Sequence, residues 1–314
     1  MTTDTHVGPV AATGPRPRQG LRTRAEARAG YLFLLPWLAG FFVLTVGPMI
    51  ASLYLSFTDY DLFGMPEFIG AENYQNLFAD PRFRKSAQVT SLYVVLGVPI
   101  KLAAALAVAM LLNAKRKGLG FYRSAFYAPS LVAVSVSIAI VWRAMFMDDG
   151  AVDRALSVFG IHLGGWVGNT SMIMPMFILL AVWAFGAPMV IFLAGLKQVP
   201  AELYEAADMD GAGRWRKFVN ITLPMLSPVI FFNLLMETIN SFQVFASAFI
   251  ISSGTGGPAD SSLFYTLYLY IKGFSEFRMG YASAMAWILV IVVGILTLIF
   301  FRTSKFWVHY AGEE

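Results

Sequence analysis

The sequence predicts an all-α integral membrane protein with six transmembrane helices. Three observations carry this prediction: of 314 residues 57% are hydrophobic, only 13% are charged, and six stretches are long and apolar enough to cross a bilayer. A soluble globular domain has about 25% charged residues, so this chain has too few charges to coat a water-facing surface of its size. The composition therefore argues against a soluble enzyme, a disordered protein and a nucleic-acid binder.

Each predicted span has the length that a bilayer requires, about 20 mostly apolar residues. The six stretches cover approximately residues 31–57, 86–112, 122–146, 171–196, 223–251 and 282–302. Glycine and proline recur inside them, which membrane helices tolerate when neighbouring groups satisfy the freed backbone. Residues 1–30 are polar and rich in Arg, Pro and Gly, which predicts a disordered tail, and residues 303–314 form a second tail. The first apolar run is too long for the core of a signal peptide, so we expect it to be retained.

The lysines and arginines predict the direction of the spans. Fifteen of the 23 lie in the two tails and in the connections 113–123 and 197–222, whereas six lie in the alternate loops. Cytoplasmic loops carry the excess of positive charge in membrane proteins. Both termini are therefore predicted to be cytoplasmic, and the loops 58–85, 147–170 and 252–281 are predicted to lie outside.

The sequence carries no pattern for catalysis or metal binding. Cysteine is absent, and the three histidines, His6, His162 and His309, lie in three separate polar segments. Zinc sites and Ser-His-Asp triads need histidines or cysteines that can converge on one point. We therefore predict no metal, no cofactor and no catalytic residue on this chain.

The connection between the fourth and fifth spans, residues 197–227, is more than a plain linker. Pro200 suits the start of a helix, and acidic side chains follow in the first turns. The helix extends to Met209, after which Gly211 and Gly213 break it. A second amphipathic segment follows, and prolines mark the entry into the next span. The pattern predicts a helix, a glycine hinge and a second helix at the cytoplasmic surface.

Part of this connection resembles a known signature. The residues that carry it are Glu205-Ala206-Ala207, Gly211 and Ile221-Thr222-Leu223-Pro224. Their order and spacing resemble the EAA signature of the permease subunits of bacterial ABC importers, and residues 197–227 are called the EAA loop below. Further segments resemble the carbohydrate-uptake branch of that family, related to the maltose and glycerol-phosphate permeases: Phe242-Gln243-Val244-Phe245, Gly256-Gly257-Pro258 and Gly280-Tyr281-Ala282-Ser283-Ala284. Ala246 departs from the family pattern, which often has an aspartate there, so no sugar contact is assigned to it.

The resemblance implies a type I ABC importer permease fold and a set of partners. A second homologous permease would complete the pathway, a dimer of ATPase subunits would bind ATP and Mg²⁺, and an extracellular binding protein would deliver sugar. This chain has no G-x-x-x-x-G-K-[ST] loop, so it lacks the phosphate cradle needed to use ATP itself. The ATPase-coupling residues that the resemblance implies are Glu205, Ala206, Ala207, Asp210, Gly211, Leu223 and Pro224. The alternative is an amphipathic helix lying on lipid, whose polar face should be basic, whereas acidic residues dominate this one.

A polar face in the fifth span is the candidate substrate path. Its residues are Asn233, Glu237, Asn240 and Ser241 on one side of a helix, with Gln243 just beyond. A carboxylate at membrane depth costs about 2.5–3.5 kcal/mol, so this face should meet protein or a wet cavity. Either it hydrogen-bonds sugar hydroxyls, or Glu237 and Asn240 bridge neighbouring helices. Lys101 in the second span could pair with Glu237 or extend to an interface, and Trp183 and Phe185 are interpreted as packing residues.

Three other functions compete with this interpretation. A stand-alone secondary transporter would show inverted repeats and several intramembrane acids, and a membrane enzyme would show a catalytic constellation. An ABC permease for a non-sugar solute would share the EAA loop but not the carbohydrate-branch segments. The sequence favours one permease subunit of an ATP-driven, binding-protein-dependent sugar importer in the inner membrane of a bacterium.

Overall fold

A computed structural model describes residues 19–114, 118–133, 135–161 and 164–309. The first eighteen residues of the predicted N-terminal tail and the end of the C-terminal tail lie outside these ranges. So do Lys115, Arg116 and Lys117, which contributed to the predicted orientation, and two of the three histidines. The chain divides into two units, residues 1–52 and residues 53–314.

The described part of the first unit is helical. α1 spans Gln19–Phe41, a π-helical turn spans Phe42–Val46, and α2 spans Gly47–Leu55. The helix begins well before residue 31, so residues 19–30 are not the disordered tail that the sequence predicted. Six of these twelve residues are Arg or Ala, which are strong helix formers, and this outweighs the low hydrophobicity on which the prediction relied. Residues 29–55 are long and apolar enough to cross a membrane.

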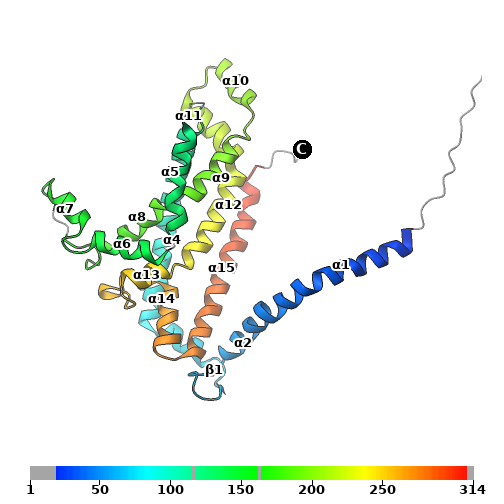
Figure 1. The fold of residues 1–314 in the computed structure, drawn as a ribbon, viewed down its shortest axis with the longest axis vertical. Helices are drawn as coiled ribbons and strands as arrows, with labels where there is room; N and C mark the ends of the chain where they lie inside the picture. Colours follow the sequence, from blue (N-terminus) through cyan, green and yellow to red (C-terminus); the bar gives the residue numbers. More distant parts are fainter. Residues whose placement is uncertain (1–18, 115–117, 134, 162–163, 310–314) are drawn as a thin grey trace, which may run out of the picture. The chain divides into compact units, whose positions relative to one another are not determined.

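α4 (Pro81–Leu112) lies against several other helices of the second unit. Its N-terminus is capped by Asp80, whose carboxylate accepts a hydrogen bond from the backbone N–H of Arg82 at 2.8 Å. α4 contacts α8 (Ile173–Trp183), α9 (Gly186–Leu196), α12 (Leu223–Phe242) and α14 (Tyr265–Tyr270). Figure 1 shows α5 (Leu119–Val132), α9, α12 and α15 (Met279–Trp307) running beside one another.

The described residues contain four helices that are long and apolar enough to span a membrane. They are Ala29–Leu55, Pro81–Leu112, Arg214–Phe242 and Met279–Trp307. The predicted third and fourth spans are each a bent pair of helices. α5 meets the segment of α6 (Val136–Phe146) and α7 (Ala151–Ser157) at 95°, and α8 meets α9 at 46°. The number of spans rises to six if each bent pair is one crossing.

The fifth predicted span ends earlier than the sequence predicted. α12 stops at Phe242, and a new helix, α13, covers Ala246–Ile251, so the single helix predicted over residues 223–251 is wrong at its outer end. Between them Phe245 has φ −127° and ψ −60°. The break frees backbone groups, and Thr266 satisfies one by donating its hydroxyl hydrogen to the carbonyl of Val244 at 2.5 Å. A hydropathy profile cannot show this break, because the group that satisfies the freed carbonyl comes from a segment distant in the sequence.

The cap is the end of the second unit opposite α10, as Figure 1 shows. It consists of β1 (Thr58–Asp59), β2 (Glu67–Phe68), α3 (Glu72–Ala79), α13 and α14. β1 pairs with β2 in an antiparallel ladder. Asn73 ties the cap together by donating hydrogen bonds from Nδ2 to the carbonyls of Ser56 and Thr58 at 3.0 and 2.8 Å. Gly280 is required where α15 begins, because a Cβ there would lie 2.0 Å from the carbonyl oxygen of Thr58.

Asp80 also anchors the cap to the bundle. Its Oδ2 accepts hydrogen bonds from the hydroxyls of Tyr268 and Tyr281, the latter at 2.8 Å. Beside it, Arg82 makes a 2.7 Å ion pair with Asp260. Burial opposes ionisation of the Asp80 carboxyl, but the hydrogen bonds from the two tyrosines and from backbone N–H groups outweigh it, so the pKa of Asp80 lies below its ordinary value of 3.8.

Replacing Asp80 by Asn is therefore expected to destabilise the protein in a pH-dependent way. A lowered folded-state pKa means that the carboxylate stabilises the fold fully above its ordinary pKa, and that this stabilisation is lost as the pH falls through the lower, folded-state value. Loss of the charged acceptor is expected to cost about 1–3 kcal/mol at neutral pH. Thermal unfolding in detergent, followed from neutral to acidic pH, measures the difference from wild type. Asp59→Asn, an exposed acid of the same cap, is the control, and a difference independent of pH would contradict the assignment.

Candidate functional site

The EAA loop folds as two short helices joined by a glycine turn, as the sequence predicted. α10 spans Ala201–Met209, and α11 spans Arg214–Lys217. Gly211 has φ +70°, a conformation that residues with a side chain rarely adopt. This backbone conformation explains why a glycine occupies the hinge. The backbone N–H of Ala212 donates to the carbonyl of Ala207 at 2.8 Å and closes the end of α10.

The two helices of the loop are tied to each other and to α12. The hydroxyl of Tyr204 hydrogen-bonds the hydroxyl of Thr222 at 2.9 Å. Lys217 forms an ion pair with Asp208 across the glycine turn. Thr222 ends a π-helical turn, Phe218–Thr222, that continues directly into α12. A displacement of α10 would therefore be passed to the first turns of α12.

One face of the loop is open. No residue of α10 or α11 is buried, and Met209 and Trp215 are 89% and 76% exposed. Large exposed apolar side chains on a projecting element indicate a surface for another protein. The predicted coupling residues differ in their exposure. Glu205, Ala206, Asp210 and Gly211 are exposed, whereas Ala207, Leu223 and Pro224 are half-buried.

The residues on the polar face of α12 differ in burial and in their partners. Glu237 pairs with Lys101 of α4, with 2.7 Å between Oε2 and Nζ, and the side chains are only 12% and 15% exposed. Asn233 is buried and donates from Nδ2 to the carbonyl of Val229 at 3.0 Å, and Ser241 is also buried. The pairing of Lys101 with Glu237, one of the two alternatives left open by the sequence, is confirmed, and Glu237 bridges two helices.

The remaining two candidates of the polar face lie on the surface of the second unit. Asn240 and Gln243 are both exposed, in the last turn of α12 and at the break that follows it. An amide at membrane depth is costly against lipid, so these side chains should face another protein chain or water. The structure thus shows that one part of the polar face is buried or bridges helices and that the other part is exposed. The helical spacing alone could not make this distinction.

The aromatic residues Trp183 and Phe185 pack against other rings, as the sequence suggested. The Trp183 ring lies against Trp142, with centroids 5.7 Å apart, and Phe185 lies against Phe126 at 5.9 Å. Arg143 donates from Nη1 to the carbonyl of Ile250 at 3.3 Å and so caps the end of α13. These side chains hold helices together.

Sequence reasoning missed two contacts that stabilise the EAA loop, Tyr204 with Thr222 and Asp208 with Lys217. The opposite charges on either side of the glycine turn were a readable signal for the second contact. The first depends on how the chain reverses after Gly211. Among the residues that the structure describes, no group of three or more His, Asp or Glu side chains is placed to hold a metal ion.

Comparison with known proteins gives a family match. The family described as "binding-protein-dependent transport system inner membrane component" matches residues 91–307. A probable ABC transporter permease protein, YesP of Bacillus subtilis (strain 168), is 49% identical over 93% of this chain and 95% of its own length. The lactose transport system permease protein LacF of Rhizobium radiobacter is 34% identical over 88% of this chain and 94% of its own length.

A solved structure gives the same architecture. One chain of a bacterial alginate ABC transporter, in complex with an alginate pentasaccharide-bound periplasmic protein, superimposes with a TM-score of 0.76. The match covers 92% of this chain and 98% of the other, at 20% sequence identity. The two chains therefore share a fold.

Breaking the Lys101–Glu237 pair is expected to destabilise the bundle strongly. Lys101→Met or Glu237→Gln alone leaves one charge unpaired in a largely buried position, which costs about 3–5 kcal/mol. The double variant removes both charges and is expected to lose far less than the sum of the single losses. Unfolding in detergent of the four proteins forms the double-mutant cycle. Lys305→Met, at an exposed position near the end of α15, is the control, and additive losses would contradict the pairing.

Proposed function

The chain belongs to the family of inner-membrane components of binding-protein-dependent transport systems, and on that premise we propose that it is one permease subunit of an ATP-driven bacterial sugar importer. The family match over residues 91–307 carries the proposal. The sugar substrate rests on relatives such as LacF, a lactose permease protein that this chain matches over nearly its whole length. The carbohydrate-branch segments of the sequence also favour a sugar as the substrate.

In the proposed importer the chain forms half of the translocation pathway. A second homologous permease forms the other half, a dimer of ABC ATPase subunits binds ATP and Mg²⁺, and an extracellular binding protein delivers the sugar. This chain binds no cofactor of its own. Each bent helix pair is one crossing, which gives six spans with both termini in the cytoplasm and the cap outside, as the distribution of Lys and Arg favours.

The EAA loop is the proposed connection to the ATPase. α10 docks in a cleft of the ATPase, where Ala206 and Ala207 allow close approach and Glu205 makes a polar contact. Asp210 and Gly211 form the turn behind it, and the open face of α10 supports this role. Movement of the ATPase then reaches α12 through Leu223 and Pro224, and reaches α4 through the Lys101–Glu237 pair, as a rigid-body displacement.

The polar face of α12 is the proposed substrate path. Asn240 and Gln243 are the members whose amides are accessible, so they make the first hydrogen bonds to sugar hydroxyls. Asn233 and Ser241 are buried, and Glu237 is held by Lys101, so these three would contact sugar only after the helices move. Accessible amides at membrane depth support this assignment, because lipid offers them no hydrogen-bonding partner.

Co-purification tests the coupling proposal. The chain is expressed with its sister permease and its ATPase, and the ATPase is expected to co-purify with wild type. Glu205→Ala is expected to weaken this association, and Gly211→Val to weaken it further, because the left-handed φ of +70° strains a β-branched residue by about 1–2 kcal/mol. Glu202→Ala, another exposed acid of α10, is the matched control. A chain that transports sugar without any ATPase would overturn the proposal in favour of a secondary transporter.

Asn240→Ala is expected to lower sugar transport while leaving assembly with the ATPase unchanged. Loss of one hydrogen bond of about 0.5–1.5 kcal/mol corresponds to a decrease of about two- to twelvefold in apparent affinity. Uptake of radiolabelled sugar by vesicles measures the effect. Met236→Ala, an exposed position one turn earlier in α12, should retain wild-type uptake. Equal loss in the two variants would argue against a sugar contact at Asn240.

A further inference from the structure

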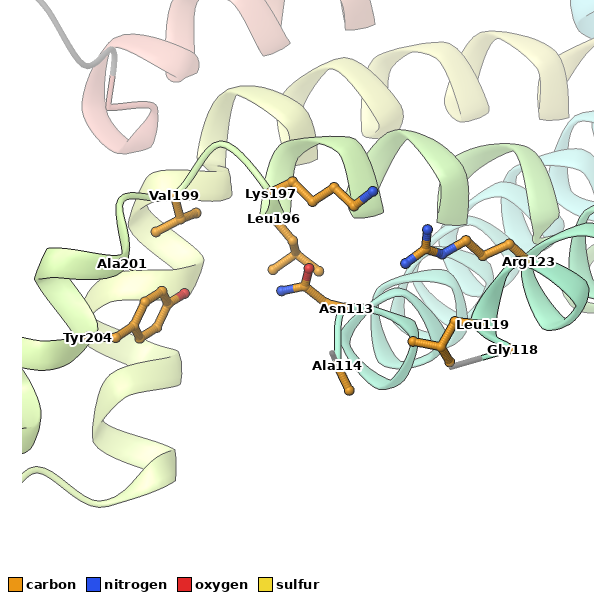
Figure 2. A pocket seen from close by; sticks show the side chains of 11 residues that line it. Asn113, Ala114, Gly118, Leu119, Arg123, Leu196, Lys197, Val199, Ala201 and Tyr204 are labelled. Carbon is orange, nitrogen blue, oxygen red and sulfur yellow. The ribbon is translucent and has the colours of Figure 1, made fainter. Parts of the chain in front are cut away.

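A pocket opens beside α10, where α4, α5 and α9 end. Its volume is about 840 Å³. Figure 2 shows the side chains that surround it, which come from the end of α4, the start of α5, the end of α9 and the start of α10. Its lining includes Gly118, Leu119, Arg123, Leu196, Lys197 and Tyr204.

The charged side chains of the pocket are both cationic. Figure 2 shows Arg123 and Lys197 extending toward one another over the same space, and no acidic residue lines the pocket. Arg123 donates from Nη2 to the carbonyl of Leu112 at 3.0 Å, while its Nε is buried without a hydrogen-bonding partner in the described structure. Lys197 is exposed, and its ammonium has no ion-pair partner among the described residues. Two like charges that share a partly enclosed space favour an anion between them.

The start of α5 adds to this positive field. α5 has 14 residues and begins after Gly118, which lies in the left-handed conformation with φ +86°. The first N–H groups of a helix have no partner within it and carry the positive end of the helix dipole. The first two of these in α5 belong to Leu119 and Gly120, which line the pocket with Arg123. Side-chain and backbone donors thus line the same pocket.

Apolar side chains form another part of the same lining. Leu196 is buried, and Leu119 and Val199 are partly buried against the core that α4 and α9 share. A ligand that fits both parts carries a negative charge at one end and hydrocarbon at the other. Basic pockets between membrane helices at the cytoplasmic side suit the head groups of anionic lipids.

We propose that this pocket binds the phosphate head group of an anionic phospholipid from the cytoplasmic leaflet. The phosphate lies between Arg123 and Lys197, and the glycerol and first methylene groups lie on Leu119 and Leu196. The choice of leaflet rests on the orientation proposed above. Because Ala201 and Tyr204 of α10 also line the pocket, the lipid contacts the proposed coupling helix together with the ends of three membrane helices. Anionic lipid therefore strengthens the link between α10 and the bundle.

Lipid retention measured by native mass spectrometry tests the proposal. The purified full chain, alone and with its partner subunits, is titrated with phosphatidylglycerol or with phosphatidylcholine. Wild type is expected to retain phosphatidylglycerol preferentially. Lys197→Gln is expected to weaken its retention about fivefold, and Arg123→Gln with Lys197→Gln about thirtyfold, since each charge contributes about 1 kcal/mol. Lys197→Gln breaks no described contact, so its effect does not depend on altered folding.

The control removes the same two charges elsewhere. Arg302→Gln with Lys305→Gln changes exposed residues near the end of α15. Equal retention by this control and by the pocket variants would overturn the proposal. If inorganic phosphate displaces phosphatidylglycerol at equal concentration, the pocket binds free phosphate and the lipid proposal is overturned. Retention is measured without sugar or ATP, so loss of transport with specific retention would count against the proposed importer alone.

Discussion

A polar group at membrane depth needs a partner inside the protein, and that requirement determines how the second unit is assembled. Lys101 and Glu237 are the clearest case, because each would be costly against lipid and their 2.7 Å contact holds α4 to α12. Thr90 of α4 accepts a hydrogen bond from the backbone N–H of Tyr265 and so positions the start of α14. Asn233 satisfies its amide within its own helix. α4 thus makes polar contacts with two of the helices that it touches, α12 and α14.

The two ends of the second unit are built in opposite ways. At the cap, Asp80 caps α4 and accepts two tyrosine hydroxyls, and the Arg82–Asp260 pair lies beside it, so the loops there are firmly held. At the other end, the side-chain hydrogen bonds and ion pairs that the structure describes for α10 and α11 go to each other and to Thr222 just before α12, and their outer face is open. One end with firmly held loops and one end with an open face suit the proposed permease subunit, whose ATPase partner docks and moves at one side of the membrane.

The contacts that stabilise the bundle are also the proposed route of coupling. α10 continues through the glycine turn and a π-helical turn into α12, and α12 is linked to α4 by the Lys101–Glu237 pair. The break at residues 243–245 separates this rigid portion from α13. The proposed sugar contacts lie beside this break, Asn240 in the last turn of α12 and Gln243 at the break itself. The pocket of Arg123 and Lys197 places the proposed lipid at the other end of the same route.

The sequence by itself determined the membrane class, the approximate spans and the helix–glycine–helix of the EAA loop. These follow from local hydrophobicity and from backbone preferences, such as the positive φ of Gly211, that neighbouring residues dictate. Tertiary structure alone decided that Lys101 meets Glu237, that α12 ends at Phe242 and that Asn240 is accessible while Ser241 is buried. Each of these depends on a partner distant in the chain, such as Thr266 for the carbonyl of Val244. A periodic pattern shows which residues share a face, but only the packed neighbours decide what that face meets.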